Sequence, residues 1–494
     1  MATMTVPQST VQANRGASVA QSVILAFLYC LPAIWSLRFV WDPDIWWHLA
    51  AGDWILQHRA FPHTDPFSAY GAGRPWVAYS WVFEVTAAWL VAHLGLIGLV
   101  ALQSALSAAI VFALQKLIFR VVPDFMISVA LTTIAVIAMD PIFAPRPWLA
   151  TILFFILVLN VVLQVREEFN HRHLWWLPLI FLVWANIHTQ FVYGLFLLLL
   201  ATAEAWWNWL NDRFSVLNRT ARNAWTIAAL GCVAATLVNP YFISVYKTAY
   251  ELGTQPAVSD LIAELQSIAF RAPSDYLLLA IGLAAVAALA WRREDRPFPW
   301  VLLLWAMVSS FRMRRDVWMM AVVGTATIAP ALRSISLSPA PRSKLQSFYP
   351  ALGAGLLLAF FCGRPSLSPQ RLQAEVAEHY PAAAVKVIEA RAIPGPLFNT
   401  YNWGGYLIWS LPRLPVSMDG RSLLQGTPRL QRSLDTWHGH RSWESDPELQ
   451  NANLIIGPQD QPLCALLRRD SRYELIYEDK VASVFVKREQ PSTK

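Results

Sequence analysis

Long apolar runs alternate with short polar connections through most of the chain. A helix needs about 20 mostly apolar residues to cross the hydrocarbon core of a bilayer, and eleven runs approach or reach that length. The runs are residues 20–40, 96–115, 125–140, 149–165, 174–187, 190–208, 224–239, 275–291, 298–311, 317–333 and 347–362. Because several of them are short, the predicted number of spans is about eleven. The pattern predicts an all-α polytopic membrane domain over residues 20–362, preceded by a polar N-terminal tail, residues 1–19.

One further apolar run, Trp81 to His93, is too short to cross and contains Glu84. We therefore predict an interfacial helix here, inside a long first loop of residues 41–95. Basic residues support this choice, because they recur in every second connection, as they do in cytoplasmic loops. These connections contain Lys116 and Arg120; Arg166 and Arg172; Arg213, Arg219 and Arg222; Arg292, Arg293 and Arg296; and Arg333, Arg342 and Lys344. A crossing at Trp81–His93 would turn all of them outward, so the N-terminus is predicted to be cytoplasmic and the first loop external.

The last part of the chain, residues 363–494, has more charge and no long apolar run. Short apolar stretches alternate there with helical ones, which is typical of a small α/β domain. The stretches are Pro396–Asn399, Leu414–Asp419, Asn453–Gly457, Tyr473–Tyr477 and Ala482–Val486. The last two predict a hairpin that turns at Glu478-Asp479-Lys480. An odd number of spans places this domain outside the membrane.

Composition agrees with a membrane protein. The chain is 56% hydrophobic and 14% charged, whereas soluble domains are about a quarter charged. The net charge of +7 could indicate nucleic-acid binding, but the basic residues are scattered in short loops, which favours membrane topology and no nucleic-acid partner.

An acidic and aromatic cluster opens the first loop. Asp42, Asp44, Trp46, Trp47 and His48 fall within a few positions of one another. Carboxylates at a membrane boundary are costly to desolvate, so they are usually there for a reason. A carboxylate is the usual general base that activates a hydroxyl. An aromatic ring beside it can stack on the apolar face of a sugar. The pair could also hold a divalent cation.

The simplest alternative for this cluster is structural. Asp44 could cap a helix that begins at Ile45, with Asp42-Pro43 as a turn. That does not explain two acids beside Trp46, Trp47 and His48, so we favour a functional role. For His48, a ligand, a base and an ordinary interfacial histidine all remain open.

The same topology places further polar groups on the outer side. Arg146, Arg312, Arg314 and Arg315 lie at the outer ends of spans, where basic residues are unusual. Arginine binds phosphate in a bidentate fork, whereas the alternative is snorkelling to lipid headgroups. His188 ends a span, and either substrate contact or local hydrogen bonding fits it.

Other motifs are typical of turns and helix starts. His63-Thr64-Asp65-Pro66 predicts a turn that supports the first loop. Tyr401–Tyr406 and Asp419-Gly420-Arg421 in the tail predict a helix entry and a turn, and could form a second lip of an outer site.

Together these motifs resemble bacterial glycosyltransferases of the GT-C type, in a branch distantly related to protein mannosyltransferases and aminoarabinose transferases. The resemblance is carried by Asp42–His48, Thr64–Ser68, Arg74–Trp76, Asn239–Tyr241 and Tyr401–Tyr406. It implies a protein of the bacterial inner membrane that transfers a sugar, with inversion, from a polyprenyl-phosphate donor to an extracytoplasmic glycan, lipid or protein.

The resemblance also implies roles for individual residues. Asp44, followed six positions later by Ala50, would be the base, and Asp42 would orient it or share a metal. Arg146 and one of Arg312, Arg314 or Arg315 would hold the donor phosphate, while Trp46, Trp47, His48 and His188 would contact substrate. The chain lacks the Asp-Glu pair of the related transferases.

Two other functions stay open at this point. A non-enzymatic transporter or lipid-binding scaffold would place polar or broken helices near the middle of the membrane. An O-antigen-type ligase or polymerase would rely on Arg and His in a large outer loop rather than on acids in the first one.

Overall fold

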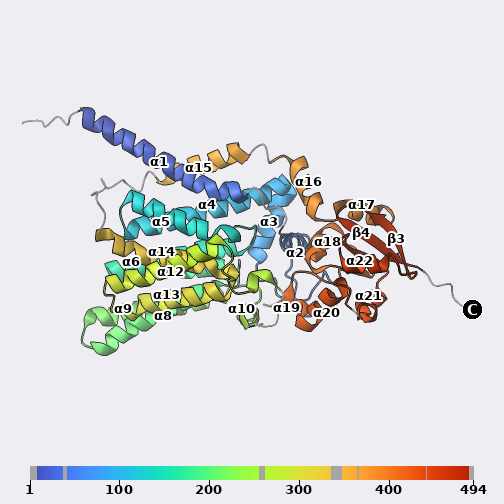
Figure 1. Ribbon diagram of the computed structural model, residues 1–494. Helices are drawn as coiled ribbons and strands as arrows, with labels where there is room; N and C mark the ends of the chain where they lie inside the picture. The colour runs from blue at the N-terminus through green and yellow to red at the C-terminus, as the bar shows by residue number, and fades with distance from the viewer. Residues whose placement is uncertain are drawn as a thin grey trace, which may run out of the picture.

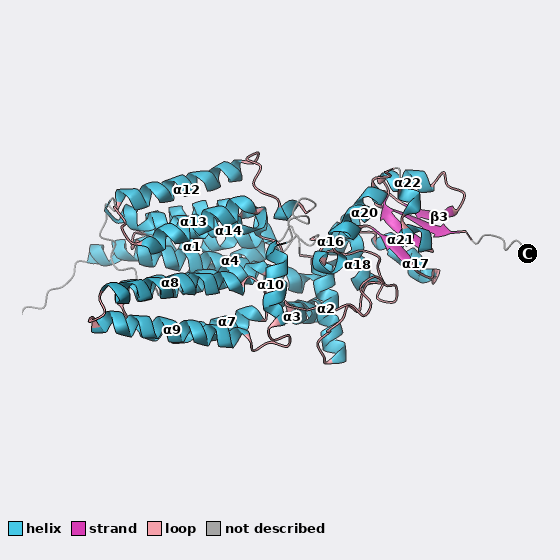
Figure 2. Ribbon diagram, turned by 90° about the horizontal axis from the view of Figure 1, so that it is seen from below, coloured by secondary structure: helices cyan, strands magenta, loops and turns pink. Residues whose placement is uncertain are grey.

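A computed structural model describes residues 8–36, 42–254, 262–334, 348–363, 367–440 and 442–488. It is built from a bundle of roughly parallel and antiparallel helices, followed by a smaller domain at one end of the bundle (Figure 1). The sheet lies wholly in that second domain (Figure 2).

Each predicted apolar run coincides with a helix of the bundle. The helices are α1 (Gln8–Ser36), α4 (Leu96–Val121), α5 (Phe125–Ala138), α6 (Trp148–Glu168), α7 (Leu177–Ala185), α8 (Phe191–Asn211), α9 (Val216–Thr236), α12 (Pro273–Trp291), α13 (Pro297–Arg312), α14 (Val317–Ile328) and α15 (Phe348–Gly363). Among the described residues, four helices are long and apolar enough to cross a membrane by length and composition: α4, α6, α8 and α12. The helical membrane architecture is therefore supported, and a crossing by all eleven stays a prediction.

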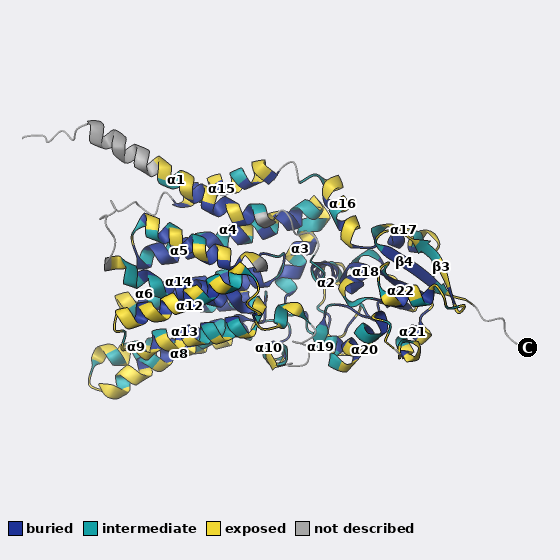
Figure 3. Cartoon of the chain, in the orientation of Figure 1, coloured by how far each residue is buried: buried dark blue, intermediate teal, exposed yellow. Residues whose placement is uncertain are grey.

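The bundle buries its polar side chains and exposes apolar ones. Buried Gln115 of α4 donates from Nε2 to Ser128 Oγ at 2.9 Å and accepts from Thr132 Oγ1 at 2.6 Å, so these groups are satisfied inside the protein. Large apolar side chains on the outer faces of five helices are exposed, namely Leu199, Leu230, Leu283, Leu304 and Leu357. Exposed positions follow the outer helices in Figure 3. This pattern suits a lipid surround.

The first loop forms two helices, α2 (Ile45–His58) and α3 (Trp81–Leu94), which pack along each other. Both lie across the end of the bundle, between it and the second domain (Figures 1 and 2). Their close approach depends on Gly52, since a Cβ there would lie 2.1 Å from the Glu84 carbonyl oxygen. The predicted interfacial helix is thus a helix, and its orientation differs from that of the bundle helices.

The C-terminal domain combines small helices with one mixed sheet. Its helices are α16 (Pro369–His379), α17 (Ala382–Ala390), α18 (Tyr401–Ser410), α19 (Ser422–Gln425), α20 (Thr427–Trp437), α21 (Pro447–Asn451) and α22 (Pro462–Leu467). Its strands are β1 (Leu397–Asn399), β2 (Leu454–Pro458), β3 (Tyr473–Glu478) and β4 (Ala482–Lys487), in the order β1-β2-β4-β3. The β1 and β2 strands are parallel and the other pairs antiparallel. The predicted closing hairpin is confirmed.

The apolar stretch Leu414–Asp419 is not a strand of this sheet, so the prediction of a strand there was wrong. Its backbone bonds to the first loop instead. Val416 N–H donates to the Phe67 carbonyl at 3.2 Å, and Ala69 N–H donates to the Val416 carbonyl at 3.0 Å. The backbone amide and carbonyl of Val416 are thus paired with the first loop. These hydrogen bonds attach the second domain to that loop.

A buried ion cluster strengthens this attachment. The Arg421 guanidinium contacts Asp65 Oδ1 of the first loop at 2.5 Å and Asp419 Oδ2 at 2.8 Å. All three side chains are almost completely buried. The turn predicted at Asp65 is therefore a scaffold, since Asp65 also accepts from the Phe67 and Ser68 amides.

Candidate functional site

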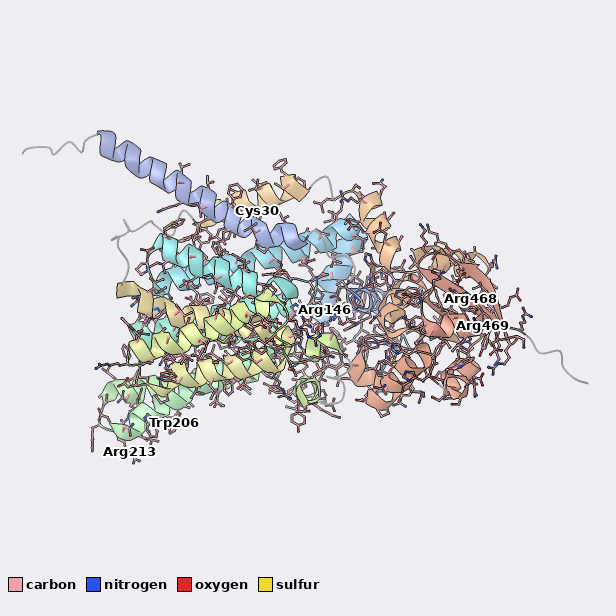
Figure 4. The ribbon with its side chains drawn as sticks, viewed as in Figure 1. Cys30, Arg146, Trp206, Arg213, Arg468 and Arg469 are labelled. Atoms are coloured by element: carbon pink, nitrogen blue, oxygen red, sulfur yellow. The ribbon has the colours of Figure 1, made fainter. Side chains whose placement is uncertain are left out.

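A cavity of about 540 Å³ lies where the bundle, the first loop and the C-terminal domain meet. Asp44 and His48 of the first loop, Arg146 before α6, His188 before α8 and Arg315 before α14 all line it. Tyr401 and Gly420–Leu424 of the C-terminal domain line it too, together with Ser244, Lys247, Thr248, Glu251, Leu252 and residues 262–265. The topology predicted from the sequence also places Asp44, Arg146, His188 and Arg315 on one side, and Figure 4 shows Arg146 near the junction with the second domain.

Asp42, Asp44 and Arg146 form the charged centre of the site. Arg146 Nε donates to both Asp42 carboxylate oxygens at 2.8 Å, and its Nη1 contacts Asp44 Oδ2 at 2.5 Å. Glu264 lies 3.5 Å from the same Nη1. Asp44 lines the cavity, whereas Asp42 is not among its lining residues. Arg146 therefore holds the two acids in place and also lines the cavity, and its contact with a donor phosphate stays a prediction.

Asp44 occupies the N-cap position of α2 but does not cap it, because its side chain accepts no hydrogen bond from a backbone amide of the first turn. Asp42 accepts the Asp44 amide at 2.9 Å instead. Burial raises the pKa of the Asp44 carboxyl to about 7, while the Arg146 guanidinium opposes this rise. A carboxyl that titrates near neutral pH can accept a proton from a substrate hydroxyl.

His48 is paired on its far side with a buried acid of α3. Its Nδ1 lies 3.0 Å from Glu84 Oε1, and both side chains are almost completely buried. Burial lowers the pKa of His48 well below its usual value and raises that of Glu84 to about 8. A neutral His48 whose orientation is fixed by Glu84 therefore forms one wall of the cavity.

Arg315 provides a cation in the cavity wall. Its Nε is buried and, among the described residues, has no hydrogen-bond partner. The next residue, Asp316, is satisfied by Gln190 Nε2 at 2.8 Å and the Tyr193 hydroxyl at 2.7 Å. Arg312 and Arg314 are exposed and do not line the cavity. The structure thus distinguishes Arg315 among the three arginines that the sequence left open.

His188 and the two tryptophans take different places. His188 lines the cavity, and its Nδ1 lies 2.9 Å from the Thr151 hydroxyl. Trp47 lines the cavity and packs on His48 with ring centroids 3.6 Å apart. Trp46 is completely buried against Tyr406 of the C-terminal domain, with centroids 5.1 Å apart. Trp46 does not line the cavity, because adjacent positions on a helix face different sides, and its predicted substrate contact is not supported by this placement.

Several lining residues were not expected from the sequence. Lys247 of α10 (Ser244–Thr254) and Glu264 come from the long loop after α9. Tyr79 also lines the cavity. The charged residues lie in polar loops, where a sequence offers no sign of which side chains turn inward. Glu84 did carry a signal, because it interrupts an otherwise apolar run.

Glycines allow the C-terminal domain to approach this centre closely. A Cβ on Gly405 of α18 would lie 2.6 Å from the Pro43 carbonyl oxygen, and one on Gly420 would lie 1.9 Å from Asp44 Oδ1. The Tyr401–Tyr406 and Asp419–Arg421 motifs thus form the second lip of the site.

The Asp42 and Asp44 carboxylates do not fit a divalent cation. The Arg146 guanidinium contacts both of them and already supplies the compensating positive charge. Within the described part of the chain, no group of three or more His, Cys, Asp or Glu side chains is placed to hold a metal ion. Compared with protein-family models and with curated proteins, the chain matches neither a family nor an individual protein.

Proposed function

We propose that this protein is a membrane glycosyltransferase of the GT-C type, which transfers a sugar from a polyprenyl-phosphate donor to an extracytoplasmic acceptor. One observation carries the proposal. Asp44, a carboxyl that titrates near neutral pH, faces the same cavity as Arg315, whose buried Nε has no hydrogen-bond partner among the described residues. A base for a hydroxyl and a cation for a phosphate are the two groups that such a transfer needs.

In the proposed reaction, Asp44 accepts the proton of the acceptor hydroxyl. The hydroxyl oxygen then forms a bond with the anomeric carbon, on the face opposite the phosphate. The bond between the anomeric carbon and the phosphate oxygen breaks, and the polyprenyl phosphate leaves with the electron pair. Arg315 and Lys247, which both line the cavity, stabilise the charge on that phosphate. Arg146 keeps Asp44 in position, with Asp42 as its second partner.

The surroundings of the cavity suit such a donor. The rings of Trp47, Trp76 and Trp148 line it, and aromatic faces stack on sugars. The bundle beside it has helices that are long and apolar enough to lie in a bilayer, which is where a polyprenyl chain resides. In this proposal the bundle spans the bacterial inner membrane about eleven times, with the cavity and the C-terminal domain outside.

A transporter is less well supported, because the two ends of the bundle are separated by packed side chains. A second cavity lies at the opposite end and shares no lining residue with the first. On α6, Trp148 lines the first cavity and Leu159 the second, about 16 Å apart along a helix. Between them Ile152 and Phe155 are completely buried.

Lipid binding provides a first test. Native mass spectrometry of the purified full chain should detect polyprenyl phosphate more strongly than polyprenol, which lacks the phosphate. Arg315→Gln should weaken phosphate-lipid binding by about 10- to 100-fold, the usual contribution of charge-assisted hydrogen bonds. Arg314→Gln is the matched control, since Arg314 is adjacent but exposed and outside the cavity. Equal binding of both lipids, or an equal loss in both variants, would remove the phosphate role of Arg315.

A further inference from the structure

A second cavity, of about 410 Å³, lies at the other end of the bundle. The ends of α4, α6, α12, α13 and α14 enclose it, together with the 3-10 turn η5 (Ala329–Ser334). This is the end that carries the basic connections. Figure 4 shows one of these, the α8–α9 turn with Arg213, at the opposite end of the bundle from Arg146.

The charged lining of this cavity is net positive. It contains four arginines and two glutamates, namely Arg166, Arg292, Arg296, Arg333, Glu167 and Glu294. Two residues outside the lining pair with it: Arg120 with Glu167, and Glu204 with Arg166. The positive charge of Arg120 and the negative charge of Glu204 cancel. The excess positive charge therefore persists when the neighbours are included.

Two of the arginines have weak internal pairing. Arg333 donates from Nε to the Val121 carbonyl, and it has no carboxylate partner within the described residues. Arg292 Nη1 lies 3.8 Å from Glu294, which is already bound by Arg296 Nε at 2.7 Å. In contrast, Arg166 forms a bidentate pair with Glu204 at 2.6 Å. Arg292 and Arg333 are thus the cations available to an anion in this cavity.

Beneath the charged rim, the wall is apolar. Leu159, Leu163, Leu289, Leu302 and Val323 line the cavity. A phosphate ion alone would gain nothing from such a wall, whereas an amphiphile would place its phosphate at the rim and its glycerol and acyl carbons below.

Exposed aromatic side chains mark the depth of this end in a bilayer. Phe169, Trp291 and Trp300 are exposed at the ends of α6 and α12 and the start of α13. Aromatic belts of this kind lie at the level of the lipid headgroups. The cavity therefore opens where phospholipid headgroups reside, and Phe169 itself belongs to its lining.

We propose that this cavity binds the headgroup of an anionic phospholipid, with its phosphate on Arg292 and Arg333 and its glycerol region against the apolar wall. Basic pockets between membrane helices on the cytoplasmic side bind acidic headgroups in this way. The site is independent of the sugar-transfer proposal, since the two cavities have no residue in common.

The test uses the purified full chain, freed of lipid and examined by native mass spectrometry. The probes are phosphatidylglycerol, phosphatidylcholine with the same acyl chains, and inorganic phosphate. Arg333→Gln, which changes an exposed side chain, should lower the affinity for phosphatidylglycerol. The double variant Arg292→Gln/Arg333→Gln should lower it by about tenfold or more. Arg213→Gln is the matched control, because it lies at the same end but outside the cavity, over Trp209.

The proposal predicts that the wild type prefers phosphatidylglycerol and that Arg213→Gln keeps that preference. Equal binding of the two phospholipids, or an equal loss in the Arg213→Gln control, would overturn it. Full displacement of phosphatidylglycerol by millimolar inorganic phosphate would also overturn it, because the occupant would then be a soluble anion. Arg333→Gln should leave polyprenyl-phosphate binding unchanged, so failure of this site is distinguishable from failure of the outer one.

Discussion

Replacement of Arg421 by Gln tests how the C-terminal domain is held over the first loop. Arg421 contacts Asp65 at 2.5 Å and Asp419 at 2.8 Å, and the three side chains are almost fully buried. Arg421→Gln removes the cation and leaves two buried carboxylates without their compensating charge. The glutamine can still fill much of the same volume, so the main change is electrostatic.

The magnitude follows from that burial. Breaking a buried ion pair by removing one partner costs about 3–5 kcal/mol, and each 1.4 kcal/mol is about tenfold in an equilibrium constant. Separation of the two domains should therefore become more frequent by about two to three and a half powers of ten. The backbone bonds of Val416 to Phe67 and Ala69 cross the same contact, so their amides report this opening.

Hydrogen exchange followed by mass spectrometry is the assay. Peptides that contain Ala69 and Val416 should exchange faster by about 100-fold or more in Arg421→Gln, whereas peptides of α6 should be unchanged. Arg413→Gln is the matched control, since Arg413 is exposed in the same domain. Adding Asp65→Asn to the variant should recover part of the protection. Unchanged exchange in Arg421→Gln would refute the reasoning that this cluster holds the domains together.

Two further variants test the site. Gly420→Ala would place a Cβ 1.9 Å from Asp44 Oδ1, so sugar transfer should fall by about 100-fold. Transfer at the wild-type rate would contradict this close approach. The melting temperature of the wild type should fall between about pH 7 and 8, and Glu84→Gln should remove that fall. Because its folded pKa is raised to about 8, Glu84 is protonated when folded and ionised when unfolded over this range, so stability falls as pH rises. A fluorimetric melting series at several pH values measures it, and an unchanged slope in Glu84→Gln would contradict the assignment.

Much of the fold could be predicted from periodicity, because apolar runs in a lipid-facing bundle have few alternatives. Helix α3 was recognised because Glu84 makes its run too short and too polar to cross. Leu414–Asp419 was misassigned because its alternating pattern suits a strand, whereas its hydrogen bonds go to Phe67 and Ala69, far away in the sequence. A local pattern carries no information about such a partner.

The candidate site was predictable in location more than in detail. Topology brought Asp44, Arg146 and Arg315 to one end of the bundle, and all three line one cavity. The partners of Arg146 were not predictable, because a sequence does not indicate which anion a loop arginine meets. The same limit applies to Trp46 and Trp47. The sequence does not show which of the two faces the cavity, because that depends on how their helix packs against Tyr406 of the C-terminal domain.

The most direct measurement is sugar transfer by the purified full chain, with a panel of polyprenyl-phosphate sugars as donors and an extracted membrane fraction as acceptor. The wild type should transfer label, with a rate that rises with pH through about 7 as Asp44 ionises. Asp44→Asn should lower transfer by about 100- to 10,000-fold while it still binds polyprenyl phosphate. Asp53→Asn is the control and should retain transfer, because Asp53 lies on the same helix but outside the cavity. Full transfer by Asp44→Asn, or none from any donor by the wild type, would contradict the account.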